Sequence, residues 1–163
     1  MLSCKKLSIV LMSCLFVSQA SFAADGFPRG CEVSGYGFSK NYLVLNDTGN
    51  QRFYLIQNRS EKSIELEHVE TNPNVFMSPK LETKLGVSRW AAFASDVSHL
   101  YFQCFIRQGE ERVVVNCGDA LTVCEYPRVQ FALSNKGNYW VSTDKNQQQV
   151  VQEATKKGIF LHW

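Results

Sequence analysis

Hydrophobic and polar residues alternate most clearly in the segment 63–69, Ser-Ile-Glu-Leu-Glu-His-Val. Successive side chains of a β-strand point to opposite faces of a sheet, so this pattern predicts a half-buried strand. We expect Ile64 and Leu66 to point inward and Glu65 and Glu67 to lie in water. By the same alternation, His68 points inward near the end of the strand. We interpret it as a hydrogen-bonded residue at the margin of the core and not as a ligand-binding residue.

The stretch 88–104 combines large aromatic residues with three alanines and a cysteine. It predicts two strands joined by a turn. The even positions from 100 to 106 are Leu, Phe, Cys and Ile, so they share one face, and we expect Cys104 to point into the core. Trp90 and Phe93 are expected to fill the same interior.

Further short apolar segments, separated by turn residues, predict additional strands. Near the C-terminus the period changes: Asp144 is a candidate cap for a helix over 147–157, and Gly158 stands where a helix stop belongs. The whole pattern predicts an all-β, antiparallel β-sandwich with one short C-terminal α-helix. The architecture would be immunoglobulin-like, without the Cys and Trp spacing of a true immunoglobulin domain. The other strands are expected at 42–45, 52–57, 113–117, 121–126, 129–133, 139–141 and 159–163, and 81–87 leads into the central stretch.

The N-terminal residues predict a secretory signal peptide over 1–23. Lys5-Lys6 precede an apolar run over 7–17, and Ser21-Phe22-Ala23 supplies the small residues of a cleavage site. That run is shorter than the roughly 20 residues of a membrane span, so no transmembrane segment is expected. Alternatively, Leu11-Met12-Ser13-Cys14 loosely resembles a lipoprotein processing box, which would make Cys14 a lipid anchor, although Met12 fits such a box poorly.

Cleavage after Ala23 would leave 140 of the 163 residues, enough for a single β-sandwich domain over 24–163. The 17 Lys and Arg against 15 Asp and Glu give the full chain a formal charge of +2, and removal of Lys5 and Lys6 lowers it to 0. Without a net positive charge, nucleic acid and anionic membrane surfaces are poor candidates for partners.

The mature chain would carry four cysteines, and in an exported protein these predict two disulfides. Three connectivities are possible. A bridge across the Gly118-Asp119 turn, paired with one between the N-terminus and the central stretch, is slightly favoured over a bridge across a hairpin. The cysteines are Cys31, Cys104, Cys117 and Cys124; the favoured pairs are Cys117–Cys124 and Cys31–Cys104, and the hairpin bridge would be Cys104–Cys117.

Motifs for catalysis, metals and phosphate are missing from the sequence, so we predict no catalytic, cofactor-binding or metal-binding residues. It contains no Gly-x-Ser-x-Gly, no His-Glu-x-x-His, no phosphate loop and no Cys-x-x-Cys. A cell-wall-active enzyme would require Asp96, His99 and Arg89 to converge in one pocket. Asp96 is better interpreted as a turn cap.

Several aromatic residues fall in predicted loops or near strand ends, where they are candidates for a contact surface. The competing interpretation places them in the core and at its margins. Convergence of Tyr36, Tyr139 and Trp140 on one cleft would favour a glycan or small-ligand binder. The five candidates are Tyr36, Phe38, Tyr126, Tyr139 and Trp140.

Several short segments together resemble a known family. They are Gly30-Cys31-Glu32-Val33, Gly35-Tyr36-Gly37-Phe38, Met77-Ser78-Pro79, Arg89-Trp90-Ala91-Ala92-Phe93-Ala94-Ser95-Asp96, Phe102-Gln103-Cys104, Cys124-Glu125-Tyr126-Pro127-Arg128 and Asn135-Lys136-Gly137-Asn138-Tyr139-Trp140. These segments resemble the enhanced-entry protein EnhB family, a group of small exported proteins from intracellular bacterial pathogens such as Legionella and Coxiella. The resemblance implies a Gram-negative source, a periplasmic or surface-exposed location and a role in host-cell entry or intracellular survival. It transfers no catalytic residue.

The sequence therefore predicts an exported, disulfide-stabilised, non-enzymatic interaction protein with a partner in the envelope or the host. The contact would use the aromatic loops or an unpaired sheet edge near Met77–Pro79. The alternatives are a ligand or glycan binder and, third, a cell-wall enzyme. The oligomeric state is left open.

Overall fold

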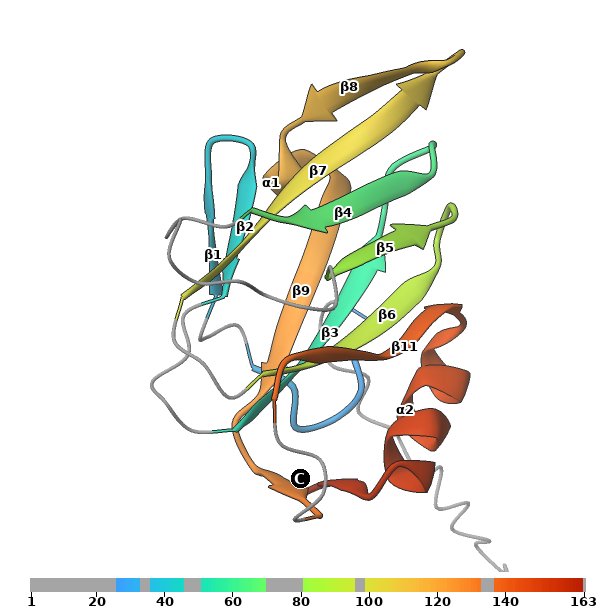
Figure 1. The fold of residues 1–163 in the computed structure, drawn as a ribbon. Helices are drawn as coiled ribbons and strands as arrows, with labels where there is room; N and C mark the ends of the chain where they lie inside the picture. Colours follow the sequence, from blue (N-terminus) through green and yellow to red (C-terminus); the bar gives the residue numbers. More distant parts are fainter. Residues whose placement is uncertain are drawn as a thin grey trace, which may run out of the picture.

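The computed structural model describes residues 26–32, 36–45, 51–69, 81–95, 99–132 and 137–162. The predicted signal peptide, Cys14, Asp96 and the segment Met77–Pro79 lie outside these residues. Within them the chain forms twelve strands and two helices, which confirms the predicted all-β class with a short C-terminal helix (Figure 1).

Six strands form an antiparallel sheet that we call the outer sheet. Its order is β1-β2-β7-β4-β5, and β8 pairs with the C-terminal half of β7 on the same edge as β2. The alternating segment of the sequence forms β4 at the centre of this sheet. The bounds are β1 (Tyr36–Ser39), β2 (Tyr42–Leu45), β4 (Ile64–His68), β5 (Glu82–Leu85), β7 (Leu100–Gln108) and β8 (Glu111–Val115).

A second antiparallel sheet, which we call the middle sheet, packs against the inner face of the outer sheet. Its order is β11-β6-β3-β9. Strands β6 and β7, predicted as two strands joined by a turn, therefore belong to different sheets. The bounds are β3 (Arg52–Asn58), β6 (Trp90–Ser95), β9 (Leu121–Tyr126) and β11 (Tyr139–Lys145).

The middle sheet is buried on both faces, so the fold has three layers. One core lies between the two sheets and contains Tyr54, Phe93 and Phe102. A second core lies on the opposite face of the middle sheet, where α2 (Gln147–Lys156), the short β10 (Val129–Phe131) and β12 (Ile159–Leu161) pair, and the N-terminal segment around Phe27 cover it. Trp90 belongs to this second core and packs edge-on against Phe27.

This third layer corrects the expectation that Trp90 and Phe93 share one interior. The two residues are three positions apart on a strand, so their side chains point to opposite faces of the middle sheet. Because both faces are buried, the strand carries a continuous apolar run instead of an alternation. The prediction for the outer sheet is confirmed, since Leu100, Phe102 and Cys104 are buried along one face of β7.

The favoured cysteine pairing was wrong, and the hairpin alternative is the observed one. The bridges are Cys104–Cys117 and Cys31–Cys124, with Cα–Cα distances of 5.4 and 5.6 Å. Cys104 lies opposite Val115 in the β7–β8 ladder, so the hairpin brings it close to Cys117 in α1 (Cys117–Ala120). Strand β9 then carries Cys124 to the second core, where the Glu32–Glu125 bridge places Cys31 beside it.

The C-terminal helix begins at Gln147 as predicted, but its capping residue is Asn146 and not the predicted Asp144. Asn146 caps α2, because its side chain accepts a hydrogen bond from the backbone N–H of Gln149 while the Gln149 side chain accepts one from the backbone N–H of Asn146. The Asp144 carboxylate instead accepts a hydrogen bond from the backbone N–H of Gly86, with an N–O distance of 2.7 Å. This contact ties the end of β11 to the end of β5.

Candidate functional site on the outer sheet

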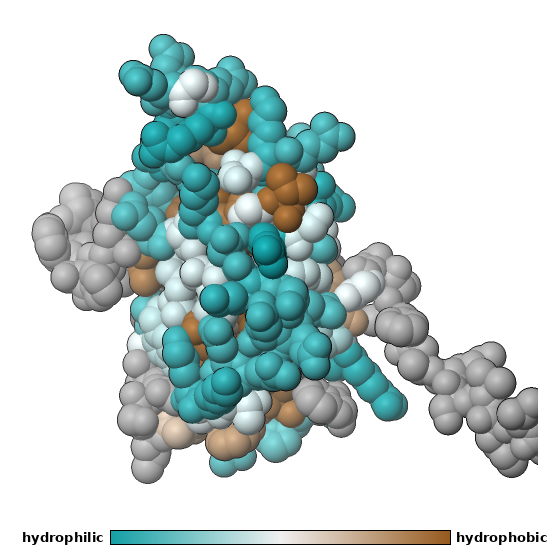
Figure 2. All heavy atoms as spheres, turned by 90° about the vertical axis from the view of Figure 1, so that its right-hand side faces the viewer, coloured by the Kyte–Doolittle hydropathy of each residue, from teal (hydrophilic) through white to brown (hydrophobic). Residues whose placement is uncertain are grey.

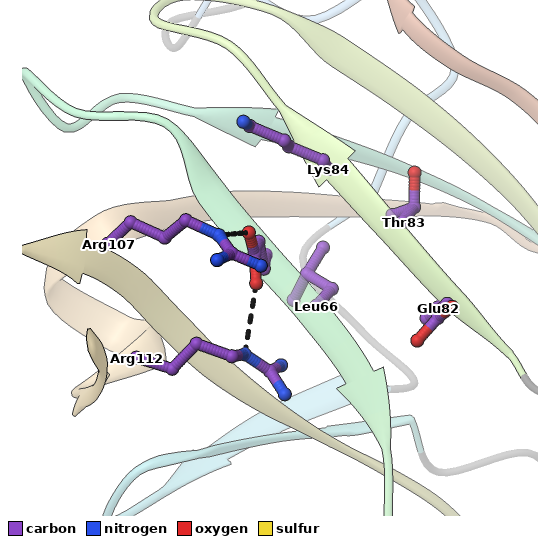
Figure 3. A pocket seen from close by; sticks show the side chains of 7 residues that line it. Leu66, Glu82, Thr83, Lys84, Arg107 and Arg112 are labelled. Carbon is purple, nitrogen blue, oxygen red and sulfur yellow. Dashed lines mark hydrogen bonds and ion pairs between the residues drawn. The ribbon is translucent and has the colours of Figure 1, made fainter. Parts of the chain in front are cut away.

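The solvent-facing side of the outer sheet carries a network of four charged residues. Arg107 on β7 donates from Nε to Glu65 Oε1 at 2.7 Å, and Arg112 on β8 donates from Nε to Glu65 Oε2 at 3.0 Å (Figure 3). Arg112 also donates from Nη2 to Glu67 Oε2 at 2.8 Å. The two glutamates expected in water thus face the solvent side, but they are half-buried beneath arginine side chains.

Strand pairing explains why these residues meet. Glu65 lies opposite Phe105 of β7, and Phe105 lies opposite Val114 of β8, so β7 separates the glutamates from the arginine of β8. Arg112 crosses that gap with its guanidinium carbon 4.0 Å from the centre of the Phe105 ring, as a cation–π contact. Its ring contact and its two carboxylate partners hold this arginine in one geometry.

The network lowers the pKa of Glu65 from its ordinary value of 4.5, chiefly because Arg107 hydrogen-bonds to the ionised carboxylate. It also raises the pKa of Arg112, chiefly through the hydrogen bond to Glu67. For a carboxyl whose pKa is lower in the folded state, the stabilising effect is complete above the unfolded pKa and is lost as the pH falls through the folded pKa. The Glu65 pairs therefore stabilise the sheet at neutral pH and are lost only in acid.

The charged network borders a shallow hollow of about 330 Å³ between the β4–β5 pair and the β7–β8 hairpin. Figure 3 shows the residues that line it, which come from four strands of the outer sheet. The lining residues are Glu65, Leu66, Glu82, Thr83, Lys84, Arg107 and Arg112.

Strand β8 lies at the free edge of this sheet. It pairs with β7, and no other described strand pairs with it. In Figure 1 it forms the upper margin of the molecule. The strand reads Glu-Arg-Val-Val-Val, and Val114 is 40% exposed on its outward face. An edge strand with three consecutive β-branched residues presents unpaired backbone groups in a conformation suited to accept another strand.

A second hollow, of about 510 Å³, opens beside the C-terminal end of β8 and has an apolar floor. Ile64, Ile106 and Val115 line it from the inner face of the outer sheet, and Ala120 lines it from α1. Ile64 and Ala120 belong to the core between the two sheets, and Ile106 and Val115 pack against it. The hollow therefore continues the first core to the surface.

The five aromatic residues predicted as a contact surface do not gather on one face. Tyr36 and Trp140 are half-buried against the core between the sheets, and Tyr139 is half-buried against the second core. Tyr126 is fully buried in the second core. Phe38, which is 40% exposed, presents the largest part of its side chain, although it also packs on Gly118 of α1.

Trp140 fills the core as part of an aromatic cluster. Its ring centre lies 4.8 Å from that of Phe93 and 5.6 Å from that of Phe102, in edge-to-face arrangements. His68 contacts the same cluster, with its ring 5.8 Å from Phe102. These contacts place Trp140, Phe102 and His68 in core packing and not around a ligand cleft.

The residues of the enzyme alternative are not drawn together where the structure describes them. Arg89 precedes β6, whereas His99 follows the far end of that strand, so the length of the strand separates them. In the same described ranges, no group of three or more His, Cys, Asp or Glu side chains is arranged to hold a metal ion. Nor does any described helix have the length and apolar character to span a bilayer.

Sequence reasoning did not find the charged network or the free edge. The alternation of Glu65 and Glu67 was a signal for an exposed strand face, but their partners depend on which strand lies beside β4. Comparison with protein-family models, curated proteins and solved structures gave no match for the chain.

Proposed function

We propose that this chain is an exported, disulfide-stabilised, non-enzymatic interaction protein that binds an extended segment of an envelope or host protein along β8. The observation that carries the proposal is the free edge of β8 beside an apolar hollow. Strand addition would satisfy the unpaired backbone groups of β8. The inward side chains of the added strand would reach the rim of the hollow at Val115, and the outward ones would lie beside Val114.

Two other edge strands, β5 and β9, are less suited to this role. The end of β5 is tied to β11 by the hydrogen bond between Gly86 and Asp144, and β9 is bridged by Glu32. Strand β5 also alternates charged residues, Glu82 and Lys84, on its outward face, a feature that protects edges from pairing. The last three residues of β8 are valines, so this part of the edge carries no charged side chain that would oppose pairing with another strand.

Two bridges and the predicted signal peptide support export to an oxidising compartment, where disulfides form and persist. The resemblance to the EnhB family supports the finer proposal that the partner is met during host-cell entry or intracellular survival. The partner class is therefore a protein of the bacterial envelope or of the host cell.

Affinity capture tests the binding surface. The tagged mature chain would be expressed in its own periplasm, cross-linked mildly and recovered with its partner for mass spectrometry. Val114→Lys places a charge on the β8 edge and should reduce partner recovery at least tenfold. The matched control is Val87→Lys, because Val87 is 51% exposed and lies in the turn after β5. This control should recover the partner as the wild type does.

Amide hydrogen exchange on the purified complex locates the contact. Residues Glu111–Val115 should exchange more slowly with the partner bound, since strand addition engages their backbone N–H groups. Equal recovery by Val114→Lys and Val87→Lys, or exchange in β8 that is unchanged by the partner, would overturn the proposal.

A further inference from the structure

A third hollow adjoins the charged network where β4 begins and β5 and β7 end. Its volume is about 420 Å³, and it is lined by Lys62, Ser63, Glu65, Lys84 and Arg107. Three cationic side chains thus surround one carboxylate. The formal charge of the lining is +2, although the mature chain as a whole is neutral.

The donors of this hollow are incompletely used. Both oxygens of Glu65 are bound by arginines, so its carboxylate is already satisfied. Arg107 uses Nε for this pair, and its side chain remains 55% exposed. Within the described part of the chain, the side chains of Lys62, Ser63 and Lys84 form no hydrogen bond or ion pair.

A buried amide holds the two lysine-bearing segments in place. Asn58, at the end of β3, is fully buried, and its Nδ2 lies 2.8 Å from the carbonyl oxygen of Lys62 and 3.1 Å from that of Leu85. The Oδ1 atom of Asn58 accepts hydrogen bonds from the backbone N–H and the hydroxyl of Ser60, which closes the turn before β4. The backbone around Lys62 and the end of β5 are therefore fixed relative to each other.

We infer that this hollow, which we call the oxyanion hollow, binds a phosphate or sulfate group. The free guanidinium nitrogens of Arg107, the two ammonium groups and the Ser63 hydroxyl are all donors, and a tetrahedral oxyanion offers enough acceptors for them. Glu65 holds Arg107 in place through Nε and binds no other donor of this hollow. Its second oxygen is bound by Arg112, which does not line the hollow. Because the mature chain as a whole would be neutral, the rest of it carries a formal charge of −2, so this is a local site and not part of a general anion-attracting surface.

The surroundings suit a group presented from solvent. Lys84 and Arg107 are exposed, and Figure 2, which views the molecule from the side that carries the hairpin tips, shows a largely hydrophilic surface with separate small apolar areas. A phosphate or sulfate monoester on a larger molecule could therefore enter without opening the fold. The oxyanion hollow shares no residue with β8 itself, although Lys62 also lines the apolar hollow beside that strand. Loss of phosphate binding with unchanged partner recovery, or the reverse, separates this inference from the proposed function.

Titration of the ¹⁵N-labelled mature chain with inorganic phosphate tests the site by NMR, with chloride at matched ionic strength as the reference. We expect saturable shifts at the amides of Ser63, Lys84 and Arg107. The double change Lys62→Gln/Lys84→Gln should raise the Kd at least tenfold, since it removes two positive charges and leaves the Arg107–Glu65 pair intact. Ser63→Ala should raise it about threefold through loss of one hydrogen bond.

The matched control is Lys145→Gln/Lys156→Gln, which removes two exposed lysines from β11 and α2 and changes the net charge equally. Its Kd should equal that of the wild type. Glucose 6-phosphate, with glucose as its uncharged reference, distinguishes a free ion from a group carried on a sugar: tighter binding than inorganic phosphate identifies the carried form. Non-saturable shifts, or an equal loss of affinity in both double variants, would overturn the inference.

Discussion

The middle sheet is buried on both faces, whereas the outer sheet is buried on one face only. The middle sheet can therefore contribute to stability, and only the outer sheet has a face available for binding. In β3 of the middle sheet, every residue from Phe53 to Ile56 is fully buried, on both faces. In β4 of the outer sheet, burial alternates, with Ile64 and Leu66 inside and the glutamates on the solvent face. A sheet covered on both sides has no face left for a ligand, so the candidate contact residues lie on the outer sheet.

Polar groups inside the middle sheet serve the fold. Glu125 is 2% exposed, and its Oε1 lies 2.8 Å from Arg52 Nη1 on the neighbouring strand. Removing either partner would leave an uncompensated charge in a mostly buried position. The ion pairs of the outer sheet are more exposed and form a surface network, so their contribution to stability is smaller.

The largest expected effect concerns the two disulfides, one of which ties the N-terminal segment to the middle sheet while the other ties β7 of the outer sheet to α1. The bridges close loops of 93 and 13 residues. Restriction of the unfolded chain then predicts a loss of about 4.7 kcal/mol for Cys31→Ala/Cys124→Ala and about 3 kcal/mol for Cys104→Ala/Cys117→Ala. Urea unfolding of each double variant measures both losses.

Wild-type protein under non-reducing conditions is the reference for this pair of variants, and fully reduced wild type should be less stable than either. A larger loss from the 13-residue loop than from the 93-residue loop would contradict the loop-length argument. It would show that the hairpin bridge acts mainly by holding the native β7–β8 geometry. The outer sheet would then contribute more to the free energy of unfolding than the loop-length argument predicts.

The next effect compares one phenylalanine from each sheet. Phe93 is fully buried between Phe102 and Trp140, so Phe93→Ala should lower the free energy of unfolding by about 4 kcal/mol through lost transfer energy and a cavity. Phe105 is half-buried on the solvent side beneath Arg112, so Phe105→Ala should cost only about 1 kcal/mol. Equal losses in urea unfolding would remove the distinction between the two sheets.

The alternating segments made the outer sheet predictable from sequence. Ile64 and Leu66 point inward as expected, and the alternation over 100–106 predicted the orientation of Cys104 correctly. A sheet buried on one face alternates apolar and polar residues, so the sequence shows which side chains point inward. The strands of the middle sheet do not alternate in this way. A continuous apolar run such as 53–56 specifies burial, but it does not show that two different cores lie on its two sides.

The disulfide pairing and the candidate site depended on contacts between distant strands. Cys124 could be placed beside Cys31 only once Glu32 was known to bridge Glu125. The oxyanion hollow is lined by residues from three separate segments. Asn58, whose side chain holds two of these segments together, looks in the sequence like an ordinary turn residue. Local patterns predict strands well, whereas strand order depends on the combined packing of the whole chain.

The smallest expected effect concerns Tyr126, a fully buried residue of the middle sheet whose hydroxyl has no hydrogen-bond partner among the residues that the structure describes. Burial raises the pKa of Tyr126 from 10.0 to about 12. An acid with a raised folded-state pKa loses stability as the pH rises above its unfolded value, so the wild type should weaken above about pH 10. Tyr126→Phe removes the unpartnered hydroxyl and should stabilise the protein by up to about 1 kcal/mol at neutral pH. The variant should also lose less stability than the wild type above about pH 10.

Tyr101→Phe, on the half-exposed face of the outer sheet, is the control and should change the unfolding free energy by less than about 0.5 kcal/mol. Destabilisation by Tyr126→Phe in urea unfolding would mean that the hydroxyl is hydrogen-bonded in solution, and the second core would then contain a polar contact of its own.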